Sequence, residues 1–415
     1  MDRRATAARL SGRSEGGAVS RRRDVLSALL AGGAALALSG CASVPPPSRG
    51  TGTLGVIVER ARGALTIVDT QQRAALGRVE GLGDLSHASV VFSRDGALAY
   101  VFGRDGALTM VDLPGRRIVR RVMQAGNSIG GAISQDGTLV AAQNYQPGGV
   151  KVFDARTLEL VADLPAEYAP GQRSRVVGLV DLPGARFAYS LFDADAIWVA
   201  DLADRAAPRI TKYPAIGRQP YDALVTPDGR HYIAGLFGED GLALLDLWQP
   251  SPAPRRILAG YGRGEAPLPV YKMPHLRGWA VAGRHAYLPA IGRHEVLVVD
   301  TASWQEVARI PVAGQPVFVM ARPDGRQVWV NFAVPDYGRV QVIDTLAQQV
   351  VRTLEPGKAV LHLEFTPRGD AVWISCRDDH VVRVVDTTSF ATLASLPVDA
   401  PSGIFFTARA GRMGM

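Results

Sequence analysis

The sequence predicts an all-β fold, an eight-bladed β-propeller closed by pairing of its N- and C-terminal strands. One observation is a strand-like pattern that recurs eight times and ends at Asp69, Asp112, Asp154, Asp201, Asp246, Asp300, Asp344 and Asp386. Another is an Asp-Gly or Pro-Gly type of turn between these copies, with its glycine at Gly96, Gly137, Gly184, Gly229, Gly283, Gly325 and Gly369. The copies are 43, 42, 47, 45, 54, 44 and 42 residues apart. A period of about 45 residues with short alternating strands is typical of a propeller.

The two ends of the chain are expected to supply the closing blade. The first unit contains two strand-like segments, 55–59 and 65–69, which we interpret as outer strands. After Asp386 the chain offers two more, about 391–398 and 403–408. Joining these halves would complete a blade and leave no open sheet edge. We therefore assign residues 54–410 to one propeller domain.

Composition excludes several classes of protein. Of the 415 residues, 47% are hydrophobic and 20% charged, which argues against a disordered chain or a multi-span membrane protein. Two cysteines and seven scattered histidines form no CxxC, CxxCH or HExxH motif, so no zinc site is expected. No Gly-x-Gly-x-x-Gly follows a strand, so there is no NAD or flavin motif. More than half of the net charge of +7 comes from residues 1–40, which weakens a nucleic-acid reading.

The N-terminus has the pattern of an export signal. Residues 1–40 place consecutive arginines before an apolar stretch that is too short for a permanent membrane helix. The pattern resembles a twin-arginine signal, and Leu-Ser-Gly-Cys41 resembles a lipobox. We expect a periplasmic protein, lipid-anchored at Cys41 or simply cleaved there, with Ala42 weakly favouring the outer membrane. Residues 41–53 are expected to form a tether.

Register predicts a face rich in histidine, arginine and tyrosine. With strands lettered A to D outward from the axis, we place the Asp-Gly turns between B and C and the Asp-ending strands outermost. The starts of strand B then share a face with the C–D turns. The strand starts hold His87, Ser128, Arg175, Tyr221 and His275. The C–D turns hold Arg60, Arg62, Arg104, Asn144, Tyr145, Asp193, Arg293, His294, Asp336, Tyr337, Arg377 and Asp378.

These residue types suit a flat anionic ligand that contains a metal. Arginine pairs with carboxylates, and histidine ligates iron. Two plainer interpretations stay open at this point. Exposed propeller turns are polar in any case, and a lone histidine is more often a structural residue than a ligand.

The stretch from His87 to Leu113 resembles the start of the eight-bladed heme d1 domain of dissimilatory nitrite reductase. That family has a histidine, a Ser-x-x-Gly turn, Gly-Arg-Asp-Gly and a Met-containing strand that ends in Asp. This chain has the turn at 93–96, Gly-Arg-Asp-Gly at 103–106 and the strand at 107–112. The resemblance implies that His87 is the axial ligand of the heme iron. It also implies that Arg104 holds tetrapyrrole carboxylates and that Arg175 belongs to the same domain. From their register on the same face, we expect Arg60, Arg377 and Tyr145 to complete the cofactor-binding set.

The chain departs from the reductase and is closer to the NirF family, which is needed for heme d1 biosynthesis. It has no CxxCH heme domain, and Val90 stands where the reductase has an arginine. Tyr221 and His275 stand where the reductase has a histidine pair. Stretches shared with the NirF family are Lys-Met-Pro-His at 272–275, Ile-Ser-Cys-Arg-Asp-Asp at 374–379 and the run at 173–181.

The resemblance implies binding of heme d1 or a dihydro-heme d1 precursor, followed by its maturation through a dehydrogenation or a side-chain modification. Tyr221, His275 and Asp181 are the candidate catalytic residues, although Asp181 fits a turn residue equally well. Implied partners are nitrite reductase and another heme d1 biosynthesis propeller. The alternative is a non-catalytic carrier that delivers the cofactor. A third alternative is a lactonase-like enzyme or an interaction scaffold. A metal-dependent lactonase fits less well, because it would need carboxylates and asparagines where this face offers arginines and histidines.

Overall fold

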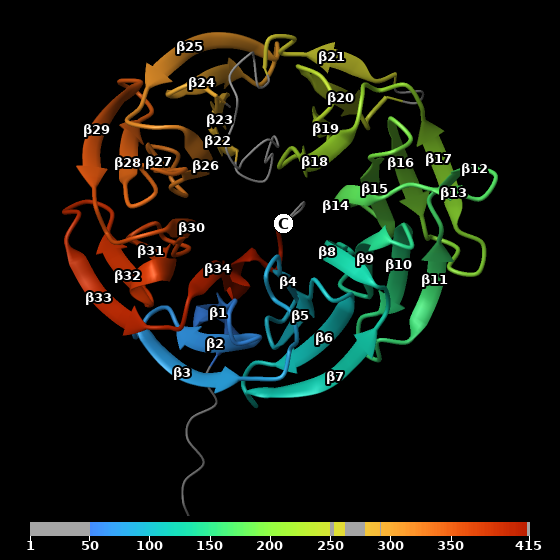
Figure 1. The fold of residues 1–415 in the computed structure, drawn as a ribbon, viewed down its shortest axis with the longest axis horizontal. Helices are drawn as coiled ribbons and strands as arrows, with labels where there is room; N and C mark the ends of the chain where they lie inside the picture. The colour runs from blue at the N-terminus through green and yellow to red at the C-terminus, as the bar shows by residue number, and fades with distance from the viewer. Residues whose placement is uncertain (1–49, 250–252, 262–278, 291, 413–415) are drawn as a thin grey trace, which may run out of the picture. The chain divides into compact units, whose positions relative to one another are not determined.

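The fold is described from a computed structural model, which covers residues 50–249, 253–261, 279–290 and 292–412. The chain divides into two units, Met1–Ser48 and Arg49–Met415, and the described residues belong to the second. They form eight four-stranded antiparallel sheets arranged as a ring (Figure 1). The predicted eight-bladed β-propeller is confirmed. Within the described ranges, no helix is long and apolar enough to cross a membrane.

Each blade contributes one strand to each of four concentric layers (Figure 1). The innermost strands are β34 (Pro401–Phe406), β4 (Ser89–Phe92), β8 (Asn127–Ile133), β14 (Val176–Leu182), β18 (Pro220–Val225), β22 (Ala280–Ala282), β26 (Pro316–Ala321) and β30 (Val360–Phe365). The second strands are β1 (Leu54–Glu59), β5 (Leu98–Phe102), β9 (Leu139–Gln146), β15 (Arg186–Leu191), β19 (His231–Leu236), β23 (His285–Pro289), β27 (Gln327–Phe332) and β31 (Ala371–Cys376).

The two outer layers complete the blades. The third strands are β2 (Ala64–Asp69), β6 (Ala107–Asp112), β10 (Gly149–Asp154), β16 (Ala196–Asp201), β20 (Leu242–Asp246), β24 (Glu295–Asp300), β28 (Val340–Asp344) and β32 (Val381–Asp386). The outermost strands are β3 (Ala74–Val79), β7 (Arg117–Met123), β11 (Leu160–Leu164), β17 (Arg209–Tyr213), β21 (Arg255–Ile257), β25 (Gln305–Pro311), β29 (Gln349–Leu354) and β33 (Thr392–Pro397). An additional hairpin pairs β12 (Glu167–Ala169) with β13 (Gln172–Arg173), and short 3-10 turns are η1 (Thr51–Thr53), η3 (Arg377–Asp379) and η4 (Thr407–Arg409).

Closure by the terminal strands is confirmed, but its division between the two ends differs from the expectation. The closing blade has the order β3-β2-β1-β34, so the N-terminus supplies three strands and the C-terminus one. Gly55 pairs with Phe406 and Ile57 with Ile404 across the seam. The segment around 391–398 is β33, the outermost strand of the preceding blade. The closure is therefore three strands plus one rather than two plus two.

The predicted strand letters were wrong by one position. The Asp-Gly turn at Gly96 joins the innermost strand β4 to β5, and the Asp-ending strand β6 is third from the axis. The error arose because the outermost strand of each blade was overlooked. The outermost strand β7, for example, is mostly exposed and has little of the apolar–polar alternation that indicates a strand. Correcting the letters by one position changes the assignment of the predicted strand starts and of the predicted turns in the same way. The inner-strand starts and the turns between second and third strands therefore still share one face, which we call the site face.

The two repeated signals have separate structural roles. The aspartate that ends each third strand closes the next turn, as when the Asp386 Oδ1 accepts the N–H groups of Thr388 and Ser389 at 2.9 and 2.7 Å. The Asp-Gly turns lie at the same end of the blade, because Leu98 pairs with Asp112, and we call this end, opposite the site face, the turn face. Gly96 adopts a φ of 67°, a left-handed conformation that glycine reaches at little cost.

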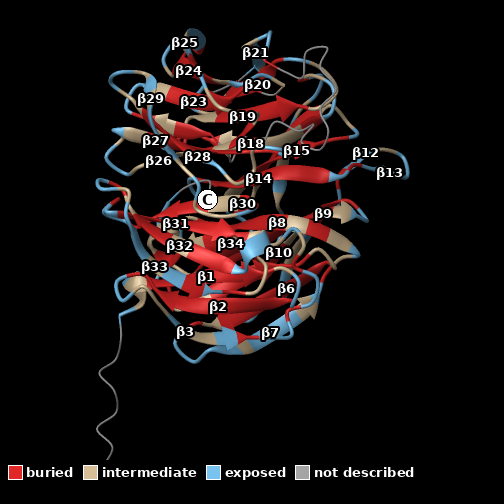
Figure 2. Ribbon diagram, turned by 60° about the vertical axis from the view of Figure 1, so that its left-hand side comes forward, coloured by how far each residue is buried: buried red, intermediate tan, exposed pale blue. Residues whose placement is uncertain are grey.

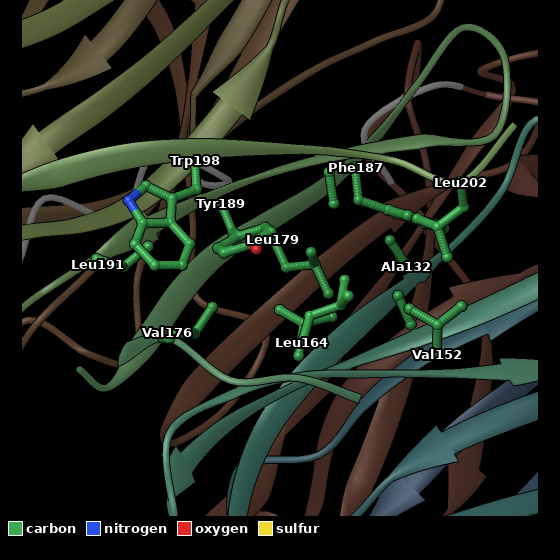
Figure 3. Packing of buried hydrophobic residues seen from close by; sticks show 14 of the residues in the cluster. Ala132, Val152, Leu164, Val176, Leu179, Phe187, Tyr189, Leu191, Trp198 and Leu202 are labelled. Atoms are coloured by element: carbon green, nitrogen blue, oxygen red, sulfur yellow. The ribbon is translucent and has the colours of Figure 1, made fainter. Parts of the chain in front are cut away.

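The core lies between neighbouring blades. Phe187, Tyr189 and Trp198 of one blade pack toward Ala132, Val152 and Leu164 of the preceding blade (Figure 3). Burial is high along the inner three strands and falls on outer strands such as β3 and β7 (Figure 2). Each blade buries its faces against two neighbours, so the ring must close to cover all of them.

Candidate functional site

The site face brings together residues from several blades. Pairing of Ser89 with Phe102 puts the start of β4 beside the turn that carries Arg104. Val176 likewise pairs with Leu191, so Arg175 lies beside the turn that begins at Phe192. His87, Arg104, Tyr145, Arg175 and Tyr221 therefore all lie on this face, as the register predicted.

A pair of tyrosines connects two blades of this face that are not neighbours. The Tyr145 and Tyr221 hydroxyl oxygens lie 2.5 Å apart, although the residues come from β9 and β18, which are two blades apart. Tyr221 also packs edge-on against Phe192, with ring centroids 5.9 Å apart. Burial raises the pKa of both tyrosines, and for Tyr145 the neighbouring Tyr221 adds to the rise. Both phenols therefore remain protonated at neutral pH and can donate a hydrogen bond.

Close packing of the innermost strands holds Tyr221 in place. Gly178, in the middle of β14, has a φ of 62° and interrupts the register of that strand. A Cβ at this position would lie 2.7 Å from the Ala223 Cβ and 2.9 Å from the Tyr221 carbonyl oxygen. Only glycine lets β14 approach β18 this closely.

Two arginines flank the tyrosines, and they differ in how far they are already paired. The Arg104 guanidinium lies 5.6 Å from the Tyr145 ring centroid. Arg175 is joined to Asp193 through Nη2–Oδ1 at 2.5 Å and Nε–Oδ2 at 3.1 Å, and it lies 4.1 Å from the Phe192 ring centroid. The Asp193 hydrogen bond raises the pKa of Arg175 further. Arg104 is thus the better placed of the two to meet an external carboxylate.

His87 is exposed and is held by its own loop. Its Nδ1 lies 2.7 Å from the Ser86 carbonyl oxygen. The Ser86 N–H donates to Asp84 Oδ1 at 2.8 Å, and the Arg104 N–H donates to the Asp84 carbonyl oxygen at 2.8 Å. Hydrogen bonds to the backbone, with help from Arg104 and His87, lower the pKa of Asp84. If Nδ1 donates its proton to Ser86, Nε2 keeps its lone pair, which is the form that ligates a metal.

A cavity of about 560 Å³ adjoins this cluster. Tyr145, Arg175 and Asp193 line it on the side of the ring. Tyr168, Gln172 and Arg173 line it from the β12–β13 hairpin. The tyrosine pair therefore stands next to a polar pocket of ligand size.

The remaining predicted residues lie apart from this cluster or outside the described residues. Arg60 and Arg377 lie in turns of the site face, on the blades at the closure seam, and the Arg377 Nε donates to Asp378 at 2.7 Å. Asp181 is buried near the opposite end of β14 from Arg175 and accepts a hydrogen bond from Gln135. His275 and Cys41 lie outside the described residues.

Sequence reasoning missed His362, a histidine on the innermost strand β30. Its Nδ1 accepts the Ile404 N–H at 3.3 Å, and its ring lies 5.5 Å from that of Phe405. Burial, with the nearby Arg409 charge, lowers its pKa to about 3. No motif marks this position, since the only sequence signal is a polar residue at mid-strand in Val-Leu-His-Leu-Glu-Phe.

Comparison with known proteins identifies the family. Residues 49–410 match the Cytochrome D1 heme domain family. Protein NirF of Stutzerimonas stutzeri is 62% identical over 380 residues, which cover 91% of this chain and 97% of the relative. The chain belongs to the NirF family. Protein NirF of Pseudomonas aeruginosa is 60% identical with the same coverage.

More distant relatives include a protein of stated activity. The dihydro-heme d1 dehydrogenase of Pseudomonas aeruginosa is 30% identical, over 84% of this chain and 70% of the relative. The solved structure of dihydro-heme d1 dehydrogenase NirN in complex with DHE has a TM-score of 0.76 at 26% identity, covering 90% of this chain and 79% of that one. Citrobacter koseri AztD, at 13% identity and a TM-score of 0.60, shows the fold alone. These NirF and NirN relatives support a role in heme d1 biosynthesis.

Proposed function

We propose that this protein binds heme d1 or its dihydro precursor on the site face, in the periplasm, and takes part in maturation of that cofactor for nitrite reductase. The observation that carries the proposal is the convergence of His87, Arg104 and the Tyr145–Tyr221 pair on one face of a heme d1-type propeller. Similarity to a dehydrogenase of dihydro-heme d1 supports the choice of ligand.

The residues present fit such a ligand. His87 is exposed, and donation of the Nδ1 proton to Ser86 would give Nε2 the lone pair that ligation of iron requires. Arg104, with Arg175, supplies positive charge for the carboxylates of the tetrapyrrole. When bound, the tetrapyrrole would supply an iron centre and a conjugated ring that can exchange electrons. That would serve a chain that has no nicotinamide or flavin motif.

The tyrosine pair is the best-placed proton donor of the described residues. The Tyr221 and Tyr145 hydroxyl groups are hydrogen-bonded to each other, and the raised pKa of each phenol keeps both protonated at neutral pH. The pair can therefore orient a polar substituent or deliver a proton to it. We keep His275 as a second acid–base candidate. Asp181 is less suited, because its carboxylate is buried and hydrogen-bonded to Gln135.

A non-catalytic carrier is the second candidate function. It is favoured by the same raised pKa values, because neither phenol is ready to act as a base at neutral pH. The two functions separate when purified protein is incubated with the dihydro precursor and an external electron acceptor, which takes the electrons of a dehydrogenation, and the product mass is followed. Loss of two hydrogens or a changed side chain supports maturation, whereas unchanged ligand bound in equal amount supports a carrier.

Binding itself is tested by titrating heme d1 into the protein and recording the visible spectrum. Wild type should bind with the spectrum of histidine-ligated iron, and His87→Ala should lose that spectrum. Exposed His294, on another turn of the site face, serves as a matched control, and His294→Ala should behave as wild type. An unaltered spectrum in His87→Ala would contradict the ligand assignment.

The periplasmic anchor is a separate proposal that rests on the lipobox-like Leu-Ser-Gly-Cys41. Cys41→Ser should move the full-length protein from the membrane fraction to the soluble periplasm. Equal membrane association of mutant and wild type would contradict lipidation.

A further inference from the structure

The β12–β13 hairpin is an addition to the propeller plan. The connection from the outermost strand β11 to the next innermost strand β14 spans residues 165–175, whereas the corresponding link from β7 to β8 spans only 124–126. The hairpin projects from the ring beside β17 in Figure 1, and it projects from the edge of the molecule in Figure 2. Connections positioned by a rigid scaffold often carry binding residues.

The hairpin forms one wall of the 560 Å³ cavity beside the tyrosine pair. Tyr168, Gln172 and Arg173 contribute from the hairpin, while Gln146 and Tyr145 contribute from the end of β9. The hairpin is held against the ring there, since a Cβ at Gly148 would lie 2.5 Å from the Ser174 carbonyl oxygen. The pocket is thus a formed concavity that is rich in hydrogen-bond donors.

Charge in this pocket is not balanced. Asp193 is engaged by the side chain and the backbone N–H of Arg175, which together satisfy both of its carboxylate oxygens. Glu167, the cross-strand neighbour of Arg173, instead accepts the Gly171 N–H at 3.1 Å. In the described part of the chain, the Arg173 guanidinium has no carboxylate within ion-pair distance. One positive charge is therefore available to an anionic ligand.

We infer that this hairpin pocket binds a carboxylate-bearing edge of the tetrapyrrole, with Arg173 as its charged partner. The inference rests on the proposed function and extends the site beyond the residues assigned there. The volume lies within the range that takes a ring edge with its substituents. Because Tyr145 lines the pocket and also contacts Tyr221, an edge held by Arg173 would decide which ring position meets the tyrosine pair. The hairpin would thus set the orientation of the ligand.

The test compares Arg173→Gln with wild type in heme d1 titrations, with binding constants and spectra both recorded. We expect affinity to fall about tenfold, because a hydrogen bond to a charged group is lost, while the histidine-ligated spectrum is kept. Arg173→Lys should recover part of the affinity, since lysine offers a charge without the planar fork. Arg156→Gln is the control, because Arg156 is equally exposed but lies on the turn face.

A second arm removes the carboxylates from the ligand. Heme d1 with esterified side chains should bind wild type more weakly than heme d1, and Arg173→Gln should lose less on esterification than wild type does. Equal affinity of Arg173→Gln and wild type for heme d1, or an equal loss on esterification, would overturn the hairpin pocket while leaving the proposed function in place. Absence of heme d1 binding to wild type would overturn both.

Discussion

The two faces of the propeller are built from the same repeat but use their polar residues differently. On the turn face, the aspartate of the repeated Asp-Gly turn bonds within its own turn, as when the Ser93 hydroxyl donates to Asp95 at 2.5 Å and the Ala97 N–H donates to the same carboxylate at 3.0 Å. On the site face, Tyr145 reaches Tyr221 across an intervening blade. Hydrogen bonds that recur from blade to blade maintain the fold, whereas a contact made by a single pair of residues is a candidate for function.

The largest effect is expected from removing β34, the strand that closes the ring. Deleting the residues after Ala400 takes away β34, whose Ile404 and Phe406 are fully buried, and exposes the edge of β1. Truncation of one such buried side chain costs about 2–5 kcal/mol, so loss of the strand removes much of the about 5–15 kcal/mol that stabilises a typical domain. Thermal unfolding and size-exclusion chromatography should show a destabilised, associating protein. A monomeric truncation that unfolds like wild type would disprove closure by β34.

Arg104→Ala should separate binding from stability. Its guanidinium has no ion pair within the described ranges, so the free energy of unfolding should change little. Affinity for heme d1 should fall by about 2–5 kcal/mol if the ligand desolvates the pair, with the histidine-ligated spectrum retained. Calorimetry and spectral titration check both parts. A variant that loses stability but keeps affinity would assign Arg104 to the fold.

His362 lies on the innermost strand and predicts a pH dependence. In the folded protein its pKa is lowered to about 3, whereas the unfolded residue titrates near 6.5. The unfolded chain therefore takes up a proton first, and stability should fall as the pH drops from about 6.5 toward 3. Urea unfolding at pH 7 and pH 5 should show a smaller loss in His362→Gln than in wild type. An identical loss would mean that other groups govern the acid response.

The smallest expected effect belongs to the turn face. Asp95→Ala removes the acceptor for Ser93 and Ala97 and should lower the free energy of unfolding by about 1 kcal/mol. Affinity for heme d1 should stay at the wild-type value, because the turn is at the other end of the blade from Arg104. Reduced affinity in this variant would break the division between the two faces.

The sequence predicted what the blades share. The terminal aspartates and turn glycines gave the correct number of blades because each makes a local bond, such as that from the Gly115 N–H to Asp112 at 2.9 Å. The strand letters failed because an exposed outer strand such as β7 carries little pattern. The prediction that His87 and Arg104 lie on one face was nevertheless correct. An error of one position in every strand assignment leaves the strand starts and the turns on the same face.

Contacts between distant blades could not be predicted in the same way. Tyr145 and Tyr221 are 76 residues apart, and their meeting depends on the close approach that Gly178 allows. The Arg175–Asp193 pair also depends on side-chain direction, which register does not specify. The resemblance to a known family supplied roles for residues, but the structure was needed to show which side chains already had partners.

The closing blade, with three N-terminal strands and one C-terminal strand, can be completed only late in synthesis of the chain. Arg62 pairs with Asp399 across 337 positions of the chain, and Thr407 bonds to Thr51 across 356. The blade that contains β1, β2 and β3 therefore lacks its innermost strand until β34 has been synthesised. Such long-range pairing is slow and leaves an open β edge while the chain waits. A nascent chain of this protein is thus most exposed to misassembly at its beginning, and its last few residues end that exposure.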